Sequence, residues 1–368
     1  MRKVPFFDYP QHWLRDREDM LSIIDKTASQ GGFIMQEDLE LFEKELADYV
    51  NCSFSLGVAN ATDAMEIYLQ ALGVGHGDEI IISAHTMLAT ASAVVMAGAK
   101  PVPVDIGEDN LICSESIEKS INQNTVAIMP TQLNGRTCDM ENIQHLTEKH
   151  SLLLVEDSAQ ALGSKFKGKS AGTFGSAGCI SFFPAKVVGC FGDAGSILTN
   201  DESLFNKMYA IRDHGRDKDG EVICWGRNSR LDNIQAAILR SKLDSYDEVI
   251  SKRRLVATIY DERLNEINEI KLPPGPNDSE HHFDIYQNYE IEAEDRDSLK
   301  EYLEKNNVGT LIQWGGKAIN HFKNLGFDQN LPNTKRFFDN CLMLPMNIFI
   351  DDDDVHYVCD KIIEFYRR

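Results

Sequence analysis

Short apolar runs alternate with helical patterns over residues 38–240 of this chain. In the helical stretches the apolar residues recur every three or four positions, whereas the runs are four to six residues long and rich in branched side chains, as buried strands are. Strands that alternate with helices favour βαβ units and a mostly parallel sheet, so an α/β fold is predicted. The expected helices are residues 38–49, 62–72 and 90–97, and the expected strands are residues 79–83, 101–105, 125–130 and 152–157.

A second unit is predicted after a long helical stretch at residues 233–254. Pro273, Pro274 and Gly275 then mark a change of character. Beyond them we expect a strand at 286–291 and helices at 295–305 and 353–366. The chain is therefore divided into a large domain, residues 1–245, and a smaller C-terminal α/β domain, residues 246–368.

Composition narrows the possible functions. The net charge of −21 argues against a nucleic-acid surface, and no apolar run is long enough to span a membrane. Eight cysteines show no CxxC spacing, so no metal site is expected. The N-terminal residues lack the apolar stretch of an export signal, which favours free thiols and a cytoplasmic location.

Lys186 is the first candidate for chemistry. It lies in an apolar, glycine-rich segment, residues 181–195 (SFFPAKVVGCFGDAG). Burial would depress the pKa of this lysine and favour the neutral amine that forms Schiff bases. A solvated surface lysine is the alternative that the residue alone leaves open.

Two further elements precede Lys186 in the chain. Asp157 closes an apolar strand, where a carboxylate could keep a pyridine nitrogen protonated, or could cap the next helix. Residues 60–64 (NATDA) open a helix whose free amides could bind a phosphate, or could carry an ordinary Asn or Thr cap. The order of phosphate site, carboxylate and lysine is that of a fold-type I pyridoxal 5'-phosphate (PLP) enzyme.

Several longer motifs carry a resemblance to a known family. They are residues 83–86 (SAHT), 97–105 (AGAKPVPVD), 156–160 (EDSAQ), 181–186 (SFFPAK), 192–195 (GDAG), 212–216 (RDHGR) and 226–237 (GRNSRLDNIQAA). Together they cover nearly the whole chain. On these motifs the chain resembles the DegT/StrS-type PLP-dependent sugar-nucleotide aminotransferases.

The resemblance implies a role for each matched residue. Lys186 would be the catalytic lysine that holds PLP, Asp157 would pair with its pyridine nitrogen, and Gln160 would lie near its phenolic oxygen. His85 takes the position of a ring-stacking side chain. The implied phosphate ligands are Ala61, Thr62 and Ser181, with Asn228 reaching the phosphate of a neighbouring subunit in a homodimer. Candidates for binding substrate are Phe33, Arg230, Trp314 and Lys317.

The chain departs from the family pattern at several of these positions. Ala61 stands where glycine is usual, and His85 is smaller than the usual aromatic residue. In two segments expected to bind substrate, Gln313–Trp314 replaces a His-Tyr pair and Gln132 replaces a histidine.

The function implied by the resemblance is transfer of an amino group, from L-glutamate, to a nucleotide-linked keto-sugar. The product would serve amino-sugar biosynthesis for a surface polysaccharide or a glycosylated metabolite. Lys186 argues against a sugar dehydratase, whose relatives carry histidine at that position. A transaminase for a smaller phosphorylated ketone and a non-catalytic scaffold of the same fold stay open.

Overall fold

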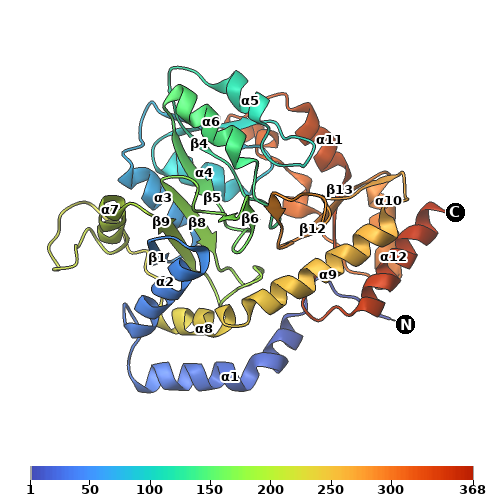
Figure 1. Cartoon of the computed structure of the whole chain (residues 1–368), viewed down its shortest axis with the longest axis horizontal. Coiled ribbons are helices and arrows are strands. Elements are labelled where there is room, and N and C mark those ends of the chain that lie inside the picture. The colour runs from blue at the N-terminus through green and yellow to red at the C-terminus, as the bar shows by residue number, and fades with distance from the viewer. Residues whose placement is uncertain (1, 368) are drawn as a thin grey trace.

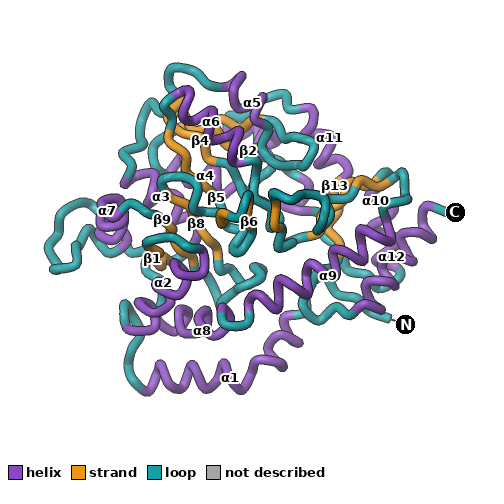
Figure 2. The backbone as a smooth tube through the Cα atoms, viewed as in Figure 1, coloured by secondary structure: helices purple, strands orange, loops and turns teal. Residues whose placement is uncertain are grey.

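A seven-stranded sheet forms the centre of the computed structural model, which describes residues 2–367 (Figure 1, Figure 2). Its strand order is β1-β9-β8-β5-β4-β2-β3, and all pairs are parallel except those of β9 with β1 and β8. The predicted α/β fold with a mostly parallel sheet is therefore confirmed. The strands are β1 (Phe54–Val58), β2 (Glu79–Ser83), β3 (Lys100–Val104), β4 (Thr125–Met129), β5 (Leu153–Asp157), β8 (Ala177–Ser181) and β9 (Gly195–Thr199).

Helices cover both faces of this sheet because its strands are apolar on both sides. In β2, Ile80 and Ile82 pack into the cluster beneath α3, α4 and α7, while Ile81 packs into the cluster beneath α5 and α6. Helices α2 and α8 cover the β8 and β9 region. These helices are α2 (Glu37–Val50), α3 (Ala61–Ala71), α4 (Leu88–Met96), α5 (Ser114–Ser120), α6 (Met140–His150), α7 (Glu202–Arg212) and α8 (Asn233–Leu243).

A second hydrophobic cluster gathers residues between Val256 and Ile362, together with Val4 near the N-terminus. It lies around a small antiparallel sheet of order β10-β12-β13, and both termini lie at this end of the molecule (Figure 1). The boundary at residue 246 remains a prediction. The elements are α9 (Tyr246–Leu264), β10 (Ile270–Lys271), β12 (Tyr289–Ala293), α10 (Arg296–Lys305), α11 (Pro332–Asn340), β13 (Cys341–Leu344) and α12 (Asp352–Tyr366).

Two sequence predictions need correction. The single helix expected at 233–254 is two helices, because α8 ends at Leu243 and α9 begins at Tyr246. The strand expected at 286–291 begins at Tyr289, since Tyr286 has a φ of 52°, which is incompatible with an extended strand. Elements that were not predicted include β1, β8 and β9 of the central sheet and α1 (Tyr9–Ser29), which lies along α8 (Figure 1). They also include a three-stranded sheet of β6 (Lys165–Phe166), β7 (Lys169–Ser170) and β11 (His282–Phe283).

Across residues 2–367, no helix is both long and apolar enough to cross a membrane. All eight cysteines are free thiols. Short 3-10 turns at Gln313–Gly316, Ile319–His321 and Lys323–Leu325 lie between α10 and α11.

Candidate active site

Asp157 ends β5 at the carboxyl edge of the central sheet, the edge at which open α/β folds bind ligands. Its side chain is 3% exposed. It accepts hydrogen bonds from the Thr90 hydroxyl at 2.6 Å and the Ala159 amide at 3.1 Å, and the Cys179 thiol lies 3.7 Å away. All three are neutral, and within residues 2–367 no basic side chain forms an ion pair with this carboxylate. A buried anion with neutral partners favours a cationic ligand.

Lys186 lies in the loop after β8, on the neighbouring strand of the same edge. Its backbone amide closes a turn by donating to the Phe183 carbonyl at 2.8 Å. Burial lowers the pKa of its amine to about 8, against the opposing pull of Asp157. No hydrogen bond ties this amine down in the described chain. Lys186 therefore combines a partly neutral amine at physiological pH with freedom to react.

The first turn of α3 lies beside the strand that follows this loop. Asn60 caps α3 by accepting a hydrogen bond from the Asp63 amide at 2.8 Å, so the alternative of an Asn cap is realised. Gly195 faces Ser181 across the β8–β9 pair, and a Cβ on Gly195 would lie 2.7 Å from the Ala61 nitrogen. This close approach requires glycine and brings the amide end of α3 alongside Ser181. Ala61 starts an ordinary helical turn without positive φ, so alanine fits where glycine is usual.

Gln160 is linked to a residue that the sequence analysis did not single out. Its side-chain oxygen accepts from the Asn134 amide at 3.0 Å. Asn134 has a φ of 54° and precedes Gly135, and an Asn-Gly pair is the signal that could have identified this turn. Its own side chain donates to Glu290 at 2.7 Å and accepts from Asn288 at 2.7 Å. Asn134 thus connects Gln160 to Glu290 of β12 and to Asn288 just before it.

His85 does not lie where a ring-stacking residue should. Its side chain is 1% exposed, and its Nδ1 lies 2.8 Å from the Asn110 carbonyl oxygen. The ring is surrounded by three aromatic side chains, with centroids 4.4 to 5.7 Å away: Phe337, Phe338 and Trp314. These rings lie where α11 and the Gln313–Gly316 turn pack over the end of β2, and His85 otherwise borders a pocket that Asn134 and Glu290 also line. The structure therefore favours the alternative of a structural histidine at a strand end.

The two glutamines that replace histidines are also structural. Gln132 is fully buried and donates to Glu156 at 2.8 Å, while its oxygen accepts from the Cys138 amide at 2.7 Å. Gln313 is 3% exposed and its amide donates to Glu290 at 2.7 Å. Both amides are occupied inside the protein, and the expectation that their two segments contact substrate stays a prediction.

The remaining predicted residues have the following surroundings. Asn228 is exposed on the segment after α7, and Arg230 pairs with Asp213 at 2.9 Å. Phe33 is 54% exposed before α2, and its carbonyl accepts from the Asn233 amide. Trp314 is partly buried against Phe338 and His85, and Lys317 is exposed. Asp157, Lys186, Ser181 and the first turn of α3 thus lie at one edge of the sheet, and the roles of the other candidates stay predictions.

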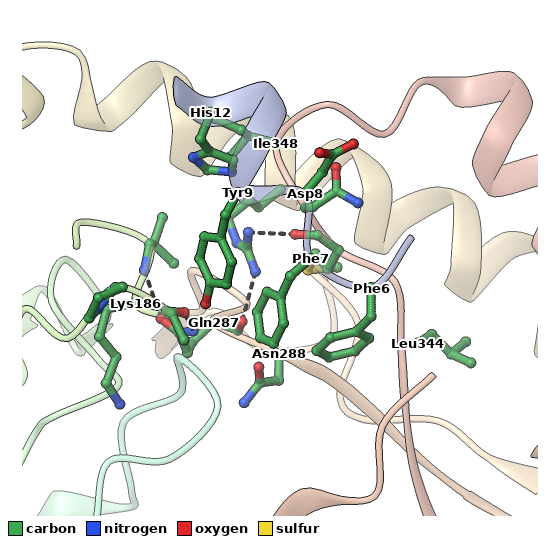
Figure 3. Close-up of a pocket in the computed structure, with 16 residues that line it drawn as sticks. Phe6, Phe7, Asp8, Tyr9, His12, Lys186, Gln287, Asn288, Leu344 and Ile348 are labelled. Atoms are coloured by element: carbon green, nitrogen blue, oxygen red, sulfur yellow. Dashed lines mark hydrogen bonds between the residues drawn. The ribbon is translucent and has the colours of Figure 1, made fainter. Parts of the chain in front are cut away.

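A pocket lies against the Lys186 loop (Figure 3). Its wall includes the N-terminal residues Phe6 to Tyr9 and, from the C-terminal domain, Gln287 and Asn288. In Figure 3 the Lys186 side chain runs away from His12 and Ile348.

The residues present fit PLP. The cofactor has a pyridine nitrogen that a buried carboxylate can keep protonated, an aldehyde that a neutral lysine can attack and a phosphate that a helix N-terminus can bind. Asp157, Lys186 and the first turn of α3 supply these three features around one edge of the sheet. Among residues 2–367 no cluster of His, Cys, Asp and Glu could hold a metal ion.

This fold and this set of side chains define a PLP-dependent aminotransferase. The match to a family model over residues 15–363 identifies the chain further: it belongs to the DegT/DnrJ/EryC1/StrS aminotransferase family.

Individual relatives cover almost the full chain. An aminotransferase of UDP-2-acetamido-2-deoxy-3-oxo-D-glucuronate from Pseudomonas aeruginosa is 32% identical, over 97% of this chain and 98% of its own. A Geobacillus stearothermophilus protein described as a pleiotropic regulatory protein is 35% identical, over 99% of both.

Solved structures agree. DesV of S. venezuelae, determined with a ketimine intermediate, superposes with a TM-score of 0.95 at 31% identity, covering 100% of both chains. NtdA of Bacillus subtilis, determined with bound cofactor PMP, gives 0.91 at 28% identity, covering 100% of this chain and 86% of its own.

Proposed function

We propose that this aminotransferase moves an amino group from L-glutamate to the keto group of a nucleotide-linked sugar, with Lys186 as its catalytic lysine. The product would enter amino-sugar biosynthesis, for a surface polysaccharide or a glycosylated metabolite, in the cytoplasm. Support for the substrate class comes from relatives whose names specify UDP- or dTDP-linked sugars. Two observations carry the proposal. Within residues 2–367 the buried Asp157 carboxylate forms no salt bridge, and the Lys186 amine makes no hydrogen bond.

The chemistry divides between the cofactor and the chain. When bound, PLP supplies an electron sink that makes the carbon–hydrogen bond beside the amino group acidic. Asp157 would hold the proton on the pyridine nitrogen, and Thr90 would orient this carboxylate through its 2.6 Å hydrogen bond. Lys186, with a pKa near 8, can carry a proton from one carbon to another at neutral pH. Ala61, Thr62 and Ser181 would bind the phosphate.

Met87 is a better candidate than His85 for contact with the cofactor ring. It is 50% exposed at the start of α4, three residues before Thr90, whose hydroxyl holds Asp157. Its flexible thioether makes favourable contacts with aromatic rings. His85, two residues earlier, is enclosed by the domain junction.

A homodimer fits the exposed segment after α7. In Figure 1 this segment projects from the body of the molecule beside α7. It carries three exposed apolar residues, Val222, Ile223 and Trp225, of which Trp225 is 99% exposed. Apolar side chains so exposed favour burial against another chain. Asn228 on the same segment would then reach the phosphate site of the second subunit.

The decisive experiment compares Lys186→Ala with Lys165→Ala, an exposed lysine on β6. We expect Lys186→Ala to lose at least about a thousandfold in turnover and to lose the absorbance band of lysine-linked cofactor. Lys165→Ala should match the wild type. Glutamate-dependent turnover that survived in Lys186→Ala would refute the assignment.

A substrate panel separates the remaining alternatives. Enzyme converted to the pyridoxamine form by glutamate is offered nucleotide-linked keto-sugars and small phosphorylated ketones in turn. Return of the lysine-linked absorbance only with the former supports the proposal, and return only with the latter favours the smaller substrate. A protein whose bound cofactor never responds to glutamate would be a scaffold.

A further inference from the structure

The side chain of Gln287 forms hydrogen bonds with the backbone on both sides of Lys186. The Gln287 amide nitrogen donates to the Ala185 carbonyl at 2.9 Å, and its oxygen accepts from the Val187 amide at 3.0 Å. Figure 3 shows Gln287 beside Lys186 in the wall of the pocket. Both polar atoms of this amide are therefore used on the two residues that flank the lysine.

These contacts fix the peptide planes from which the lysine side chain starts. Gln287 is 8% exposed, so water does not compete strongly for its hydrogen bonds. The Lys186 amide adds a third bond to the Phe183 carbonyl. A reacting group misplaced by about 1 Å can cost about a hundredfold in rate, and the lysine amine lies at the end of a long flexible stem.

Gln287 is itself held from behind by Arg253 of α9. The guanidinium donates to the carbonyls of Tyr286 at 2.7 Å, Gln287 at 2.7 Å and Met346 at 2.6 Å. Arg253 is 7% exposed, forms no ion pair within residues 2–367, and burial lowers its pKa to about 10. A buried cation paired only with carbonyls is costly, so its contribution is the geometry that it imposes on this turn. The turn includes Tyr286, whose φ is 52°.

The next residue, Asn288, contacts the turn at Asn134 and so connects to Gln160. Asn288 donates to the Asn134 side chain at 2.7 Å, and the Asn134 amide donates to Gln160. Gln287 thus contacts the lysine loop, while Asn288 contacts Asn134, the residue that binds Gln160.

We infer that Gln287, fixed by Arg253, is a positioning residue for Lys186, through which the C-terminal domain sets the place of the reactive amine. This inference rests on the proposed role of Lys186. It predicts that loss of the Gln287 amide impairs steps in which Lys186 reacts more than it impairs folding or substrate affinity.

The test variant is Gln287→Leu, and the chain offers a matched control. Gln235 grips the same loop in the same way, because its amide nitrogen donates to the Phe191 carbonyl at 2.9 Å and its oxygen accepts from the Phe191 amide at 3.0 Å. Gln235→Leu therefore removes a pair of hydrogen bonds of the same kind, but more exposed to solvent, five residues from Lys186. The measurements are the rate at which apoenzyme joins PLP covalently, its pH profile, and kcat and KM for transamination.

We expect Gln287→Leu to attach PLP and to turn over about ten- to a hundredfold more slowly, with KM within about threefold of the wild type. The midpoint of its pH–rate profile for attachment should also move from that of the wild type. Gln235→Leu should stay within about twofold in all of these. Equal behaviour of the two variants would overturn the inference.

Gln287→Glu provides a second, nearly isosteric test if the leucine variant does not fold. A carboxylate can accept from Val187 but cannot donate to Ala185, whereas a protonated carboxyl group can do both. The defect of this variant relative to wild type should therefore shrink as pH falls. A defect that is independent of pH, or absent, would contradict the positioning role.

A preliminary step separates failure of the inference from failure of the proposed function. Borohydride reduction of the wild-type PLP complex, followed by peptide mapping, identifies the attached lysine. Label on another lysine would refute the role of Lys186 and the inference with it. Label on Lys186, combined with unimpaired Gln287 variants, would refute the inference alone.

Discussion

The carboxyl edge of the central sheet holds ionisable groups at two places, and the groups serve different purposes there. At the carboxyl ends of β5 and β8 lie Asp157 and Lys186. At the carboxyl ends of β2 and β3 lie His85 and Asp105, where the C-terminal domain docks. Burial alone therefore does not distinguish a reactive site from a domain junction.

The difference lies in what holds each group. Asp105 accepts from the amides of Asn333 and Thr334 at 3.1 and 2.7 Å, and from the Thr334 hydroxyl at 2.7 Å. These bonds join the large domain to the first turn of α11. Asp157 also accepts only from neutral donors, but these come from α4 and the loop after β5, and the Lys186 amine beside it has no hydrogen bond in the described chain. A lysine amine that makes no hydrogen bond, beside a buried carboxylate, marks the end that awaits a ligand.

The largest effect that this comparison predicts is a loss of kcat on substitution of Asp157. Asp157→Asn keeps the size and can keep the Thr90 contact, but it removes the charge that would stabilise a protonated pyridine. We expect kcat to fall about a hundred- to a thousandfold, with near-native unfolding in urea. Asp105→Asn, at the junction end, should change kcat per folded molecule by less than about threefold. Comparable losses of kcat in both variants would mean that the two ends do not differ as argued.

The next effect is one of stability, at the other end. Asp105→Ala removes the carboxylate that serves the first turn of α11 in place of a local cap, and leaves buried donors unpaired. We expect the free energy of unfolding to fall by about 2–3 kcal/mol. Urea unfolding of the apoenzyme measures this loss. A decrease below about 0.5 kcal/mol would show that the junction does not depend on Asp105.

Strands β1, β8 and β9 were not predicted, whereas β2 to β5 could be, because each of these four is a short apolar run bounded by polar residues. The break between α8 and α9 could not, since Asp244 and Ser245 interrupt no helical pattern strongly. The start of β12 was also misplaced, because the left-handed conformation at Tyr286 is stabilised by Arg253, a contact 33 residues away in sequence.

The candidate site also contains some residues that could be predicted from the sequence and others that could not. Lys186 and Asp157 stand in local segments whose chemistry is visible in the sequence. The position of His85 depends on Phe337 and Phe338, which come from the other domain, and no local pattern predicts that enclosure. The contacts of Gln132 and Gln313 could not be predicted either, because their partners, Glu156 and Glu290, are distant in sequence.

A smaller effect should distinguish Lys186 from an ordinary buried lysine. Its pKa is about 8 in the folded apoenzyme and near 10.5 in the unfolded chain. Below pH 8 both states carry the proton and the full cost of the buried charge opposes folding; between pH 8 and 10.5 the unfolded state binds more protons, so stability rises with pH. Lys186→Met apoenzyme should be more stable than wild type by about 1–3 kcal/mol at pH 7, with a smaller gain at pH 10. Urea unfolding at both pH values checks this, and a gain that did not vary with pH would contradict the lowered pKa.

The smallest expected effect compares Met87 with His85. Because Met87 is half-exposed beside the Asp157 end, Met87→Ala should leave stability within about 0.5 kcal/mol and weaken PLP binding about three- to tenfold. His85→Ala, at the junction end, should instead create a cavity among Phe337, Phe338 and Trp314 and lower the free energy of unfolding by about 2 kcal/mol. Its PLP affinity should change less than that of Met87→Ala once the folded fraction is taken into account. Cofactor titration and urea unfolding of the two variants measure both quantities. The reverse order of PLP affinities would place the ring beside His85 and would mean that the junction opens to admit it.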